Sequence, residues 1–205
     1  MTSFSIERGF PADQRRAVAT LYWRAFSSKL GLLMGPDEKG VAFFERVMNP
    51  DFALTAVASG KVLGVAGFKT SEGALAGGGF RDLAAIYGWF GAAWRGLLLG
   101  MLDRDLTDGS LLMDGICVAE EARGQGVGGA LLVAIKDEAQ SRGLQDVRLD
   151  VIDTNPRARA LYERQGFVAG ETEHLGPLKH LFGFSSSVTM RYAVPAKEIR
   201  RDAAN

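Results

Sequence analysis

Cysteine and histidine are scarce in this 205-residue chain, which holds one cysteine and two histidines. A single cysteine excludes an intrachain disulfide, and so few sulfur and imidazole donors leave no metal-ligand cluster of recognisable spacing. No metal is therefore expected in the site. The one thiol, Cys117, lies in an apolar run and is expected to be a small buried side chain rather than a nucleophile.

The chain also lacks net charge, because 24 lysines and arginines balance 24 aspartates and glutamates. Without a basic excess there is no electrostatic indication of a nucleic-acid or acidic-membrane partner. No basic and then apolar leader opens the chain, so a cytoplasmic location is expected. An apolar content of 47% excludes a disordered chain. The length suits a single domain over residues 1–194, followed by a polar tail over residues 195–205.

What the sequence does contain is a glycine-rich turn, Arg-Gly-Gln-Gly-Val-Gly, at residues 123–128. Residues 111–118 before it are apolar and predict a buried strand, and the alternating residues 147–151 predict the next strand. Between them the apolar positions have helical spacing, while Lys136, Asp137, Glu138 and Gln140 are polar. Backbone N–H groups that converge at such a helix start bind anions. The turn therefore predicts a phosphate or pyrophosphate site.

Two kinds of cofactor site fit this strand–turn–helix unit. Gly124-x-Gly126-x-x-Gly129 satisfies the dinucleotide-binding pattern, with Asp150 near the position of a ribose-binding acid. Residues 119–123, however, separate the strand from the first glycine, which argues against that pattern. The phosphate-loop motif that ends in Gly-Lys-Ser/Thr is absent, so nothing supports nucleoside triphosphate hydrolysis.

The unit resembles the GCN5-related N-acetyltransferase (GNAT) superfamily. Arg123, Gly126 and Gly128 match its Arg/Gln-x-x-Gly-x-Gly/Ala signature, and residues 155–167 look like its Asn-x-x-Ala-x-x-Leu-Tyr-x-x-x-Gly-Phe segment. The resemblance implies an α/β fold with a mixed, mostly antiparallel central sheet flanked by helices, the acyl-CoA N-acyltransferase fold. It also implies acetyl-coenzyme A as cosubstrate.

By this resemblance, the coenzyme is expected to contact one strand, the glycine turn and the following helix. The residues concerned are Ile116, Cys117, Val118, Arg123, Gly124, Gln125, Gly126, Val127, Gly128, Gly129, Asn155 and Tyr162. The Val118 N–H would polarise the thioester carbonyl, and the Tyr162 hydroxyl would face the sulfur. From the residues alone, helix capping explains Asn155, half-buried packing explains Tyr162, and a surface ion pair with Glu120 or Glu121 explains Arg123.

An amine attacks a thioester only when it is neutral, so the predicted reaction needs a base. Asp114 is the candidate, because many members of the resembled family carry an acid at this strand position. Strict alternation places Asp114 on the same strand face as Ile116 and Val118, and Gly115 could mark a bulge. A hydrogen-bonded structural carboxylate is the equally weighted alternative.

Elsewhere the patterns predict strands near residues 4–6, 52–58, 62–68, 167–173 and 187–193, and helices over residues 12–30 and 37–47. The successive turns of the first helix would be marked by Ala17, Leu21, Arg24 and Ala25. Residues 80–105 predict an apolar helical insertion before the central strand. Arg95 and four glycines argue against a membrane span there, which leaves core packing, a lid over the acceptor site or a homodimer contact.

The sequence thus predicts transfer of an acetyl group to a primary amine of a small molecule or peptide, with Tyr162 and Asp114 as catalytic residues. Two other hypotheses remain open. The fold could bind an acyl-coenzyme A without catalysis, as a sensor or interaction module, or it could be a dinucleotide-binding oxidoreductase.

Overall fold

In the computed structural model, which describes residues 3–101 and 106–195, the strands form one mixed sheet. Their order across the sheet is β1-β2-β3-β5-β6-β8-β7, and a short β4 pairs with β3. The strands are β1 Ser5–Arg8, β2 Ala53–Ala58, β3 Lys61–Thr70, β4 Gly73–Ala74, β5 Ser110–Val118, β6 Asp146–Ile152, β7 Val168–His174 and β8 Ser186–Ala193. Within the described chain, β5 and β6 are the one parallel pair. The predicted mixed, mostly antiparallel sheet is confirmed.

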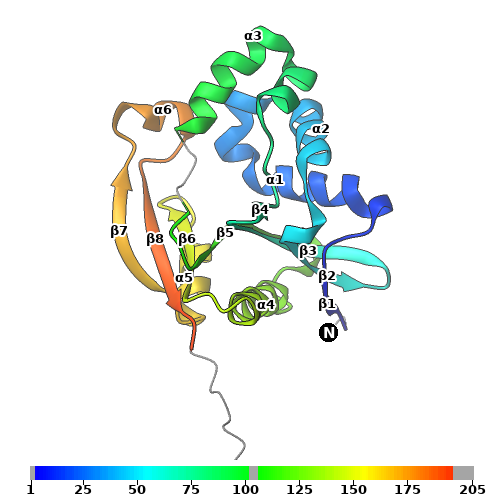
Figure 1. Cartoon of the computed structure of the whole chain (residues 1–205), viewed down its shortest axis with the longest axis vertical. Helices are drawn as coiled ribbons and strands as arrows, with labels where there is room; N and C mark the ends of the chain where they lie inside the picture. Colours follow the sequence, from blue (N-terminus) through cyan, green and yellow to red (C-terminus); the bar gives the residue numbers. More distant parts are fainter. Residues whose placement is uncertain (1–2, 102–105, 196–205) are drawn as a thin grey trace, which may run out of the picture.

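Helices cover both faces of this sheet (Figure 1). They are α1 Arg15–Met34, α2 Asp37–Val47, α3 Phe80–Gly100, α4 Val127–Ser141, α5 Pro156–Arg164 and α6 Lys179–Phe182, with 3-10 turns at Ala12–Gln14, Pro50–Phe52, Glu120–Ala122 and Gly176–Leu178. Figure 1 places α1, α2 and α3 on one side of the sheet and α4 on the other. Glycines permit close packing on both faces. A Cβ at Gly115 would lie 2.2 Å from the Phe26 ring of α1, and one at Gly64 would lie 3.1 Å from Leu131 of α4.

The parallel pair β5 and β6 separates after three residues. Ser110, Leu111 and Leu112 pair with Asp146, Val147 and Arg148, and no later residue of β5 has a partner on β6. Beyond this point β6 pairs with β8 alone, and β5 pairs with β3 alone. The centre of the sheet therefore contains a gap in its ladder, bordered by the second half of each strand.

A β-bulge interrupts β5 at Asp114. Gly67 of β3 pairs with Gly115 and Phe68 pairs with Met113, so Asp114 is the extra residue. The predicted bulge is present, beside the glycine. The expectation that Asp114 shares a face with Ile116 and Val118 was nevertheless wrong. It assumed uninterrupted alternation, which an inserted residue breaks.

The predicted helical insertion is α3, although residues 102–105 of the predicted range lie outside the described residues. Gly88, with φ of 72°, kinks the helix. Two side chains of α3 donate hydrogen bonds to the last carbonyls of α1: Tyr87 Oη to Met34 O at 2.5 Å and Arg95 Nε to Leu33 O at 2.6 Å. They satisfy carbonyl groups that a helix end leaves without helical partners.

Much of the apolar surface of α3 is exposed, although the sequence favoured its burial. Trp89 is 71% exposed and Phe90 is 93% exposed, whereas Leu83 and Ala92 are buried. Contact with a second copy of the chain stays a prediction for this surface. Among the described residues, no helix combines the length and apolarity needed to cross a membrane.

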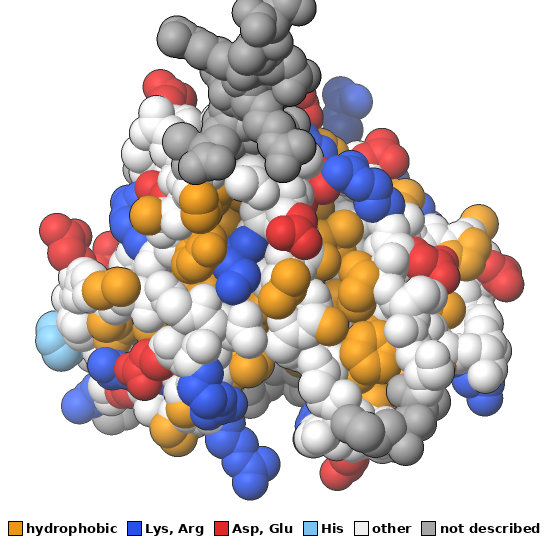
Figure 2. Space-filling model, turned by 90° about the horizontal axis from the view of Figure 1, so that it is seen from below, with side chains coloured by type: hydrophobic (Ala, Val, Ile, Leu, Met, Phe, Trp, Pro, Cys, Tyr) orange, Lys and Arg blue, Asp and Glu red, His pale blue; other side chains and the backbone are white. Residues whose placement is uncertain are grey.

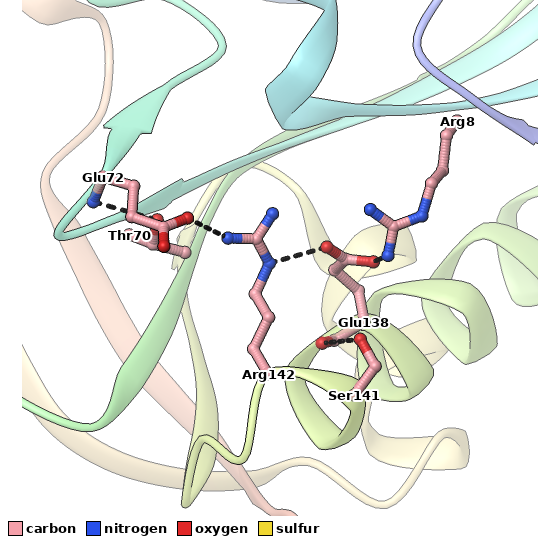
Figure 3. Close-up of polar contacts among 6 residues, drawn as sticks. All are labelled: Arg8, Thr70, Glu72, Glu138, Ser141 and Arg142. Carbon is pink, nitrogen blue, oxygen red and sulfur yellow. Dashed lines mark hydrogen bonds and ion pairs between the residues drawn. The ribbon is translucent and has the colours of Figure 1, made fainter.

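On the other side of the sheet, Glu138 of α4 links three parts of the chain (Figure 3). Its carboxylate accepts hydrogen bonds from Arg8 of β1 and, at 2.6 Å, from Nε of Arg142. Arg142 also pairs at 2.5 Å with Glu72, in the turn between β3 and β4. Glu138 is only 4% exposed, so this polar residue lies on the buried side of the helix. Two arginines compensate the buried charge.

Candidate functional site

The glycine turn leads directly into α4. Gly124 and Gly126 have φ of 76° and 85°, a backbone conformation that glycine adopts without strain. The first helical hydrogen bond runs from Ala130 N to Gly126 O at 3.0 Å, and no side chain caps this helix start. The N–H groups of Val127, Gly128 and Gly129 thus precede the first helical bond, as an anion site at a helix N-terminus requires.

Arg123 and Gln125 are fixed beside this turn. Arg123 Nε donates to Val118 O at 3.4 Å, and Gln125 Nε2 donates to Glu121 O at 2.8 Å. Among the described residues, Arg123 forms no ion pair with Glu120 or Glu121. The guanidinium is exposed at the turn. Figure 2, seen from the side of α4, shows Lys and Arg side chains intermixed with Asp and Glu. At the turn, the N–H groups of the first turn of α4 and the helix dipole add to the positive charge of Arg123.

The start of α4, the end of β5 and the middle of α5 meet at Gly128. A Cβ built there would lie 3.3 Å from Leu161 of α5 and 3.8 Å from Val118 of β5. Lys136 ties the two helices together further along, because its Nζ donates to Gln165 O and Oε1, each at 3.2 Å. The two sequence motifs, residues 123–128 and 155–167, therefore lie side by side.

The end of β5 presents backbone groups to the gap in the sheet. Ala119 N donates to Leu63 O of β3 at 2.7 Å, so the Ala119 N–H faces β3. Backbone groups of successive residues point to opposite edges of a strand, so the N–H groups of Val118 and Ile116 face the β6 side. Cys117 between them is buried, and its Sγ lies 3.7 Å from Val65 O. Burial raises the pKa of this thiol to about 12, so it is protonated at neutral pH. The expected burial of Cys117 is confirmed.

Asn155 and Tyr162 both belong to α5. Asn155 Oδ1 accepts a hydrogen bond from Ala158 N at 3.2 Å, so helix capping does account for this side chain. Tyr162 is 6% exposed and its ring centroid lies 6.0 Å from that of Phe167. Burial raises the pKa of Tyr162 to about 12. The hydroxyl therefore keeps its proton throughout the neutral range.

Asp114 lies on the opposite side of the sheet from the glycine turn, in a cavity of about 840 Å³. Residues of β5 and β6 both line this cavity, so it covers the gap between the two strands. Neither Ile116 nor Val118 lines it, which follows from the bulge at Asp114. Burial and then the Asp114 charge raise the pKa of Tyr22 well above its ordinary value, which indicates that the carboxylate lies near this hydroxyl.

Sequence reasoning missed most of the cavity wall. Tyr22, Phe26 and Leu30 of α1 recur every four residues, a helical spacing that indicates a shared face. Nothing in the sequence distinguishes such a face from ordinary core. The cavity also includes Asp150 of β6, whose Oδ1 accepts from Thr189 Oγ1 at 2.6 Å. Asp150 thus lies on the other side of the sheet from the glycine turn. It is not placed to bind the ribose of a dinucleotide held at that turn.

The site thus combines a glycine-initiated helix on one side of the gap between β5 and β6 with a cavity on the other side. The sequence profile of the acetyltransferase (GNAT) family matches residues 15–167. The chain belongs to this family, and the recognition made from the two motifs is confirmed. A dinucleotide-binding oxidoreductase is set aside, because its doubly wound parallel sheet is not the sheet found here.

Solved structures share the fold at low sequence identity. A protein described as an acetyltransferase is 22% identical with a TM-score of 0.61, covering 93% of this chain and 100% of its own. A GCN5-related N-acetyltransferase from Kribbella flavida is 18% identical with a TM-score of 0.61, covering 93% and 97%. The ribosomal-protein-S18-alanine N-acetyltransferase from Escherichia coli is 18% identical with a TM-score of 0.57, covering 96% and 98%. No curated protein matches by sequence.

Proposed function

We propose that this acetyltransferase transfers the acetyl group of acetyl-coenzyme A to a primary amine of a small molecule or peptide, by direct attack of the amine. One observation carries the proposal. The gap between β5 and β6 has an uncapped, glycine-initiated helix on one side and a carboxylate-bearing cavity on the other. Two substrates that approach from opposite faces can meet there, and holding them together removes much of the entropic barrier to reaction.

The glycine turn fits a pyrophosphate. Gly124 and Gly126 leave open space, since a Cβ at either would have no neighbour within 4 Å. The N–H groups of Val127, Gly128 and Gly129 would hold the phosphate oxygens, with the helix dipole adding to the attraction. Arg123 and Gln125 belong to the turn itself, and Asn155 lies at the start of the neighbouring helix. The pantetheine arm would follow Ile116, Cys117 and Val118 along the open edge of β5.

The thioester supplies an acyl carbon that is open to attack by an amine. The Val118 N–H, directed to the gap, would donate a hydrogen bond to the carbonyl oxygen as negative charge develops on it. A nitrogen–carbon bond forms and a carbon–sulfur bond breaks, giving an amide and a free thiol. Of the two protons that the ammonium loses, one ends on sulfur and the other is released to solvent. Asp114, in the cavity wall, is the proposed acceptor of that released proton, directly or through water.

Tyr162 would act at the sulfur. With its pKa at about 12, the hydroxyl is neutral at pH 7 and can donate. An ordinary thiol has a pKa of about 8.5, well below that of Tyr162, so complete transfer of the tyrosine proton to a thiolate is unfavourable. A hydrogen bond that strengthens as the carbon–sulfur bond breaks is the role that this pKa supports.

The pyrophosphate assignment is tested by calorimetric titration with acetyl-coenzyme A of two matched variants, Gly126→Leu and Gly143→Leu. Both glycines have positive φ, 85° and 69°, in open space at opposite ends of α4. The backbone penalty is therefore similar, whereas only the residue 126 side chain would obstruct the turn. We expect Gly126→Leu to weaken binding at least about ten-fold, equivalent to about 1.4 kcal/mol, and Gly143→Leu to leave it unchanged.

Equal binding by both variants would remove the glycine turn from the coenzyme site. Catalysis is tested separately by following thiol release with a panel of amines. Tight binding of acetyl-coenzyme A without thiol release to any amine would instead support a non-catalytic sensor.

A further inference from the structure

After the kink at Gly88, the outer face of α3 carries a line of large apolar side chains. Phe90, Trp94, Leu97 and Met101 are separated by four, three and four residues, which places all four on one face of the helix. They are 93%, 43%, 72% and 53% exposed, and we call them the α3 seam. Alternating spacings of four and three are typical of a helix that packs against another helix.

The inner face of α3 is already used by the fold. Leu83 and Ala92 are buried, and α3 contacts α1 and α2. The guanidinium carbon of Arg95 lies 4.2 Å from the centroid of the Trp94 ring, while Arg95 Nε donates to Leu33 O of α1. Trp94 is therefore held in place before any partner binds, and a side chain that is already ordered loses less entropy on association. In Figure 1, α3 is the outermost helix on its side of the sheet.

The exposed apolar area of α3 exceeds that of an ordinary monomer surface. Phe80 and Trp89 are 43% and 71% exposed, and their rings are in contact with centroids 5.4 Å apart. At about 200 Å² for a large side chain, the exposed parts of these two residues and of the α3 seam amount to roughly 700 Å². The largest apolar patch on a typical monomer is about 300–600 Å². Each partner in a stable complex contributes about 800 Å², so α3 offers close to one half of an interface.

The charges of the chain favour a second copy as the partner. From Leu83 to Met101, Arg95 is the one charged residue, and its Nε donates to α1. The 24 basic and 24 acidic residues of the chain balance, so two copies can approach without net electrostatic repulsion. A helix that lies on an anionic membrane carries Lys and Arg on its polar face, a pattern that α3 does not have.

We infer that the α3 seam pairs with the α3 seam of a second copy of the chain, antiparallel, about a two-fold axis between Trp94 and Leu97. In this register Phe90 packs against the partner's Met101 and Trp94 packs against the partner's Leu97, so each ring meets a flexible or branched side chain. The antiparallel order places the positive end of each helix dipole beside the negative end of the other. The contact is the same on both copies and closes at two. It adds an assembly to the proposed function and does not depend on it.

Sedimentation velocity of the whole chain tests the pairing with two variants matched by exposure. Leu97 in the α3 seam and Val168 on β7 are each 72% exposed, so a glutamate at either position disturbs little of the fold. We expect dimers at micromolar concentration for the wild type and for Val168→Glu. Leu97→Glu should raise the dissociation constant of the dimer at least about ten-fold. A monomeric wild type, or equal dimerisation of the two variants, would overturn the inference.

Disulfide trapping tests the register. Phe90→Cys and Met101→Cys are oxidised separately and as a mixture, and we expect linked dimers only in the mixture. In the antiparallel pair the two copies of residue 90 are about 16 Å apart along the helix axis, beyond the roughly 7 Å between Cα atoms that a disulfide allows. Cys117 is buried and does not compete. Linked dimers of Phe90→Cys alone would indicate a parallel pair, and absence of linkage in every sample would place the contact elsewhere; either result would overturn the inference.

A bilayer surface is the competing partner for an exposed row of aromatic side chains. Flotation of the wild type with vesicles of neutral phosphatidylcholine separates the two partners, because vesicle binding requires the same face that the dimer covers. We expect the wild type to remain unbound. Wild-type protein that floats with the vesicles, together with Leu97→Glu protein that does not, would assign the α3 seam to lipid and contradict the dimer.

Discussion

Tyr162 is a residue whose surroundings limit its chemistry. Burial raises its pKa to about 12, so it can donate a hydrogen bond but is a poor source of a transferred proton. We predict that Tyr162→Phe lowers kcat about 10²-fold, the lower end of the effect of a positioned proton donor, and leaves the Kd for acetyl-coenzyme A unchanged. Steady-state kinetics of thiol release and calorimetry measure the two quantities.

The control for that substitution is Tyr192→Phe. The Tyr192 ring packs at a tilt against Phe167, as the Tyr162 ring does, but Tyr192 belongs to β8 and has Lys136 Nζ 4.7 Å from its ring centroid. A similar loss of kcat in both variants would show that the aromatic packing, and not the Tyr162 hydroxyl, is what matters.

Asp114 makes a different prediction, because a base must be ionised to accept a proton. As pH falls and the carboxylate gains a proton, kcat should fall with it in the wild type. We expect Asp114→Asn to lower kcat about 10²-fold or more and to abolish this acidic limb, whereas Asp114→Glu should retain the limb. The pH dependence of kcat at saturating amine checks this. An acidic limb that persists in Asp114→Asn would assign the base to another group.

At the residue scale, the sequence predicted helix starts better than side-chain orientation. The motifs located Gly126 at the start of α4 and Asn155 at the start of α5, because capping and turn preferences are local. The face of Asp114 was wrong, because alternation assumes an unbroken register and the bulge depends on how β3 pairs with β5. Cavity-lining aromatic residues on α1 carry no local signal that separates them from core residues.

At the scale of elements, Glu138 joins α4 to β1 and, through Arg142, to the turn after β3. Its removal would leave two arginines without their shared partner and a small void under the helix. We predict that Glu138→Ala lowers the free energy of unfolding by about 3 kcal/mol. Glu163→Ala, which breaks an exposed pair with Arg159 on α5, should cost about 0.5 kcal/mol or less. Urea titrations of both variants make the comparison, and equal losses would refute the buried-pair argument.

Element boundaries followed from the sequence where the periodicity was strong. The expected helix over residues 37–47 is α2 with the same bounds. The expected strand over 147–151 is one residue shorter than β6 at each end, and the one over 187–193 is one residue shorter than β8 at its start. For α1, most of the residues expected to mark successive turns do not lie on the buried face. Ala17, Arg24 and Ala25 are exposed, while Val18, Tyr22 and Trp23 are buried. An apolar helix contacted by α2, α3 and the sheet has a broad buried face, so small residues do not mark it.

For the whole molecule, buried groups that must stay neutral predict sensitivity to alkali. Folding raises the pKa of Cys117 from 9.0 to about 12, and that of Tyr162 from 10.0 to about 12. Below pH 9 both groups are largely neutral in the folded chain and in the unfolded chain, so they add no pH dependence to the free energy of unfolding. Above pH 9 the unfolded chain loses protons that the folded chain retains, so stability falls towards pH 12. The Cys117 shift alone corresponds to about 4 kcal/mol.

Cys117→Ala tests this directly. Without the thiol, the alkaline fall in the free energy of unfolding should begin near pH 10, where tyrosines ionise, instead of near pH 9. Urea titrations between pH 8 and 11 follow the change. Curves of the same shape for Cys117→Ala and the wild type would mean that the thiol does not couple folding to protons.

The α3 wall of the cavity and the glycine turn are encoded by separate stretches of chain. One wall of the cavity is α3, which packs on α1 and α2, whereas the glycine turn and α5 belong to residues 123–167. Substitutions in α3 can therefore accumulate without disturbing the coenzyme turn. During evolution, residues 75–101 could be remodelled as a cassette, so that acceptor preference diverges between relatives while the machinery for the donor is inherited intact.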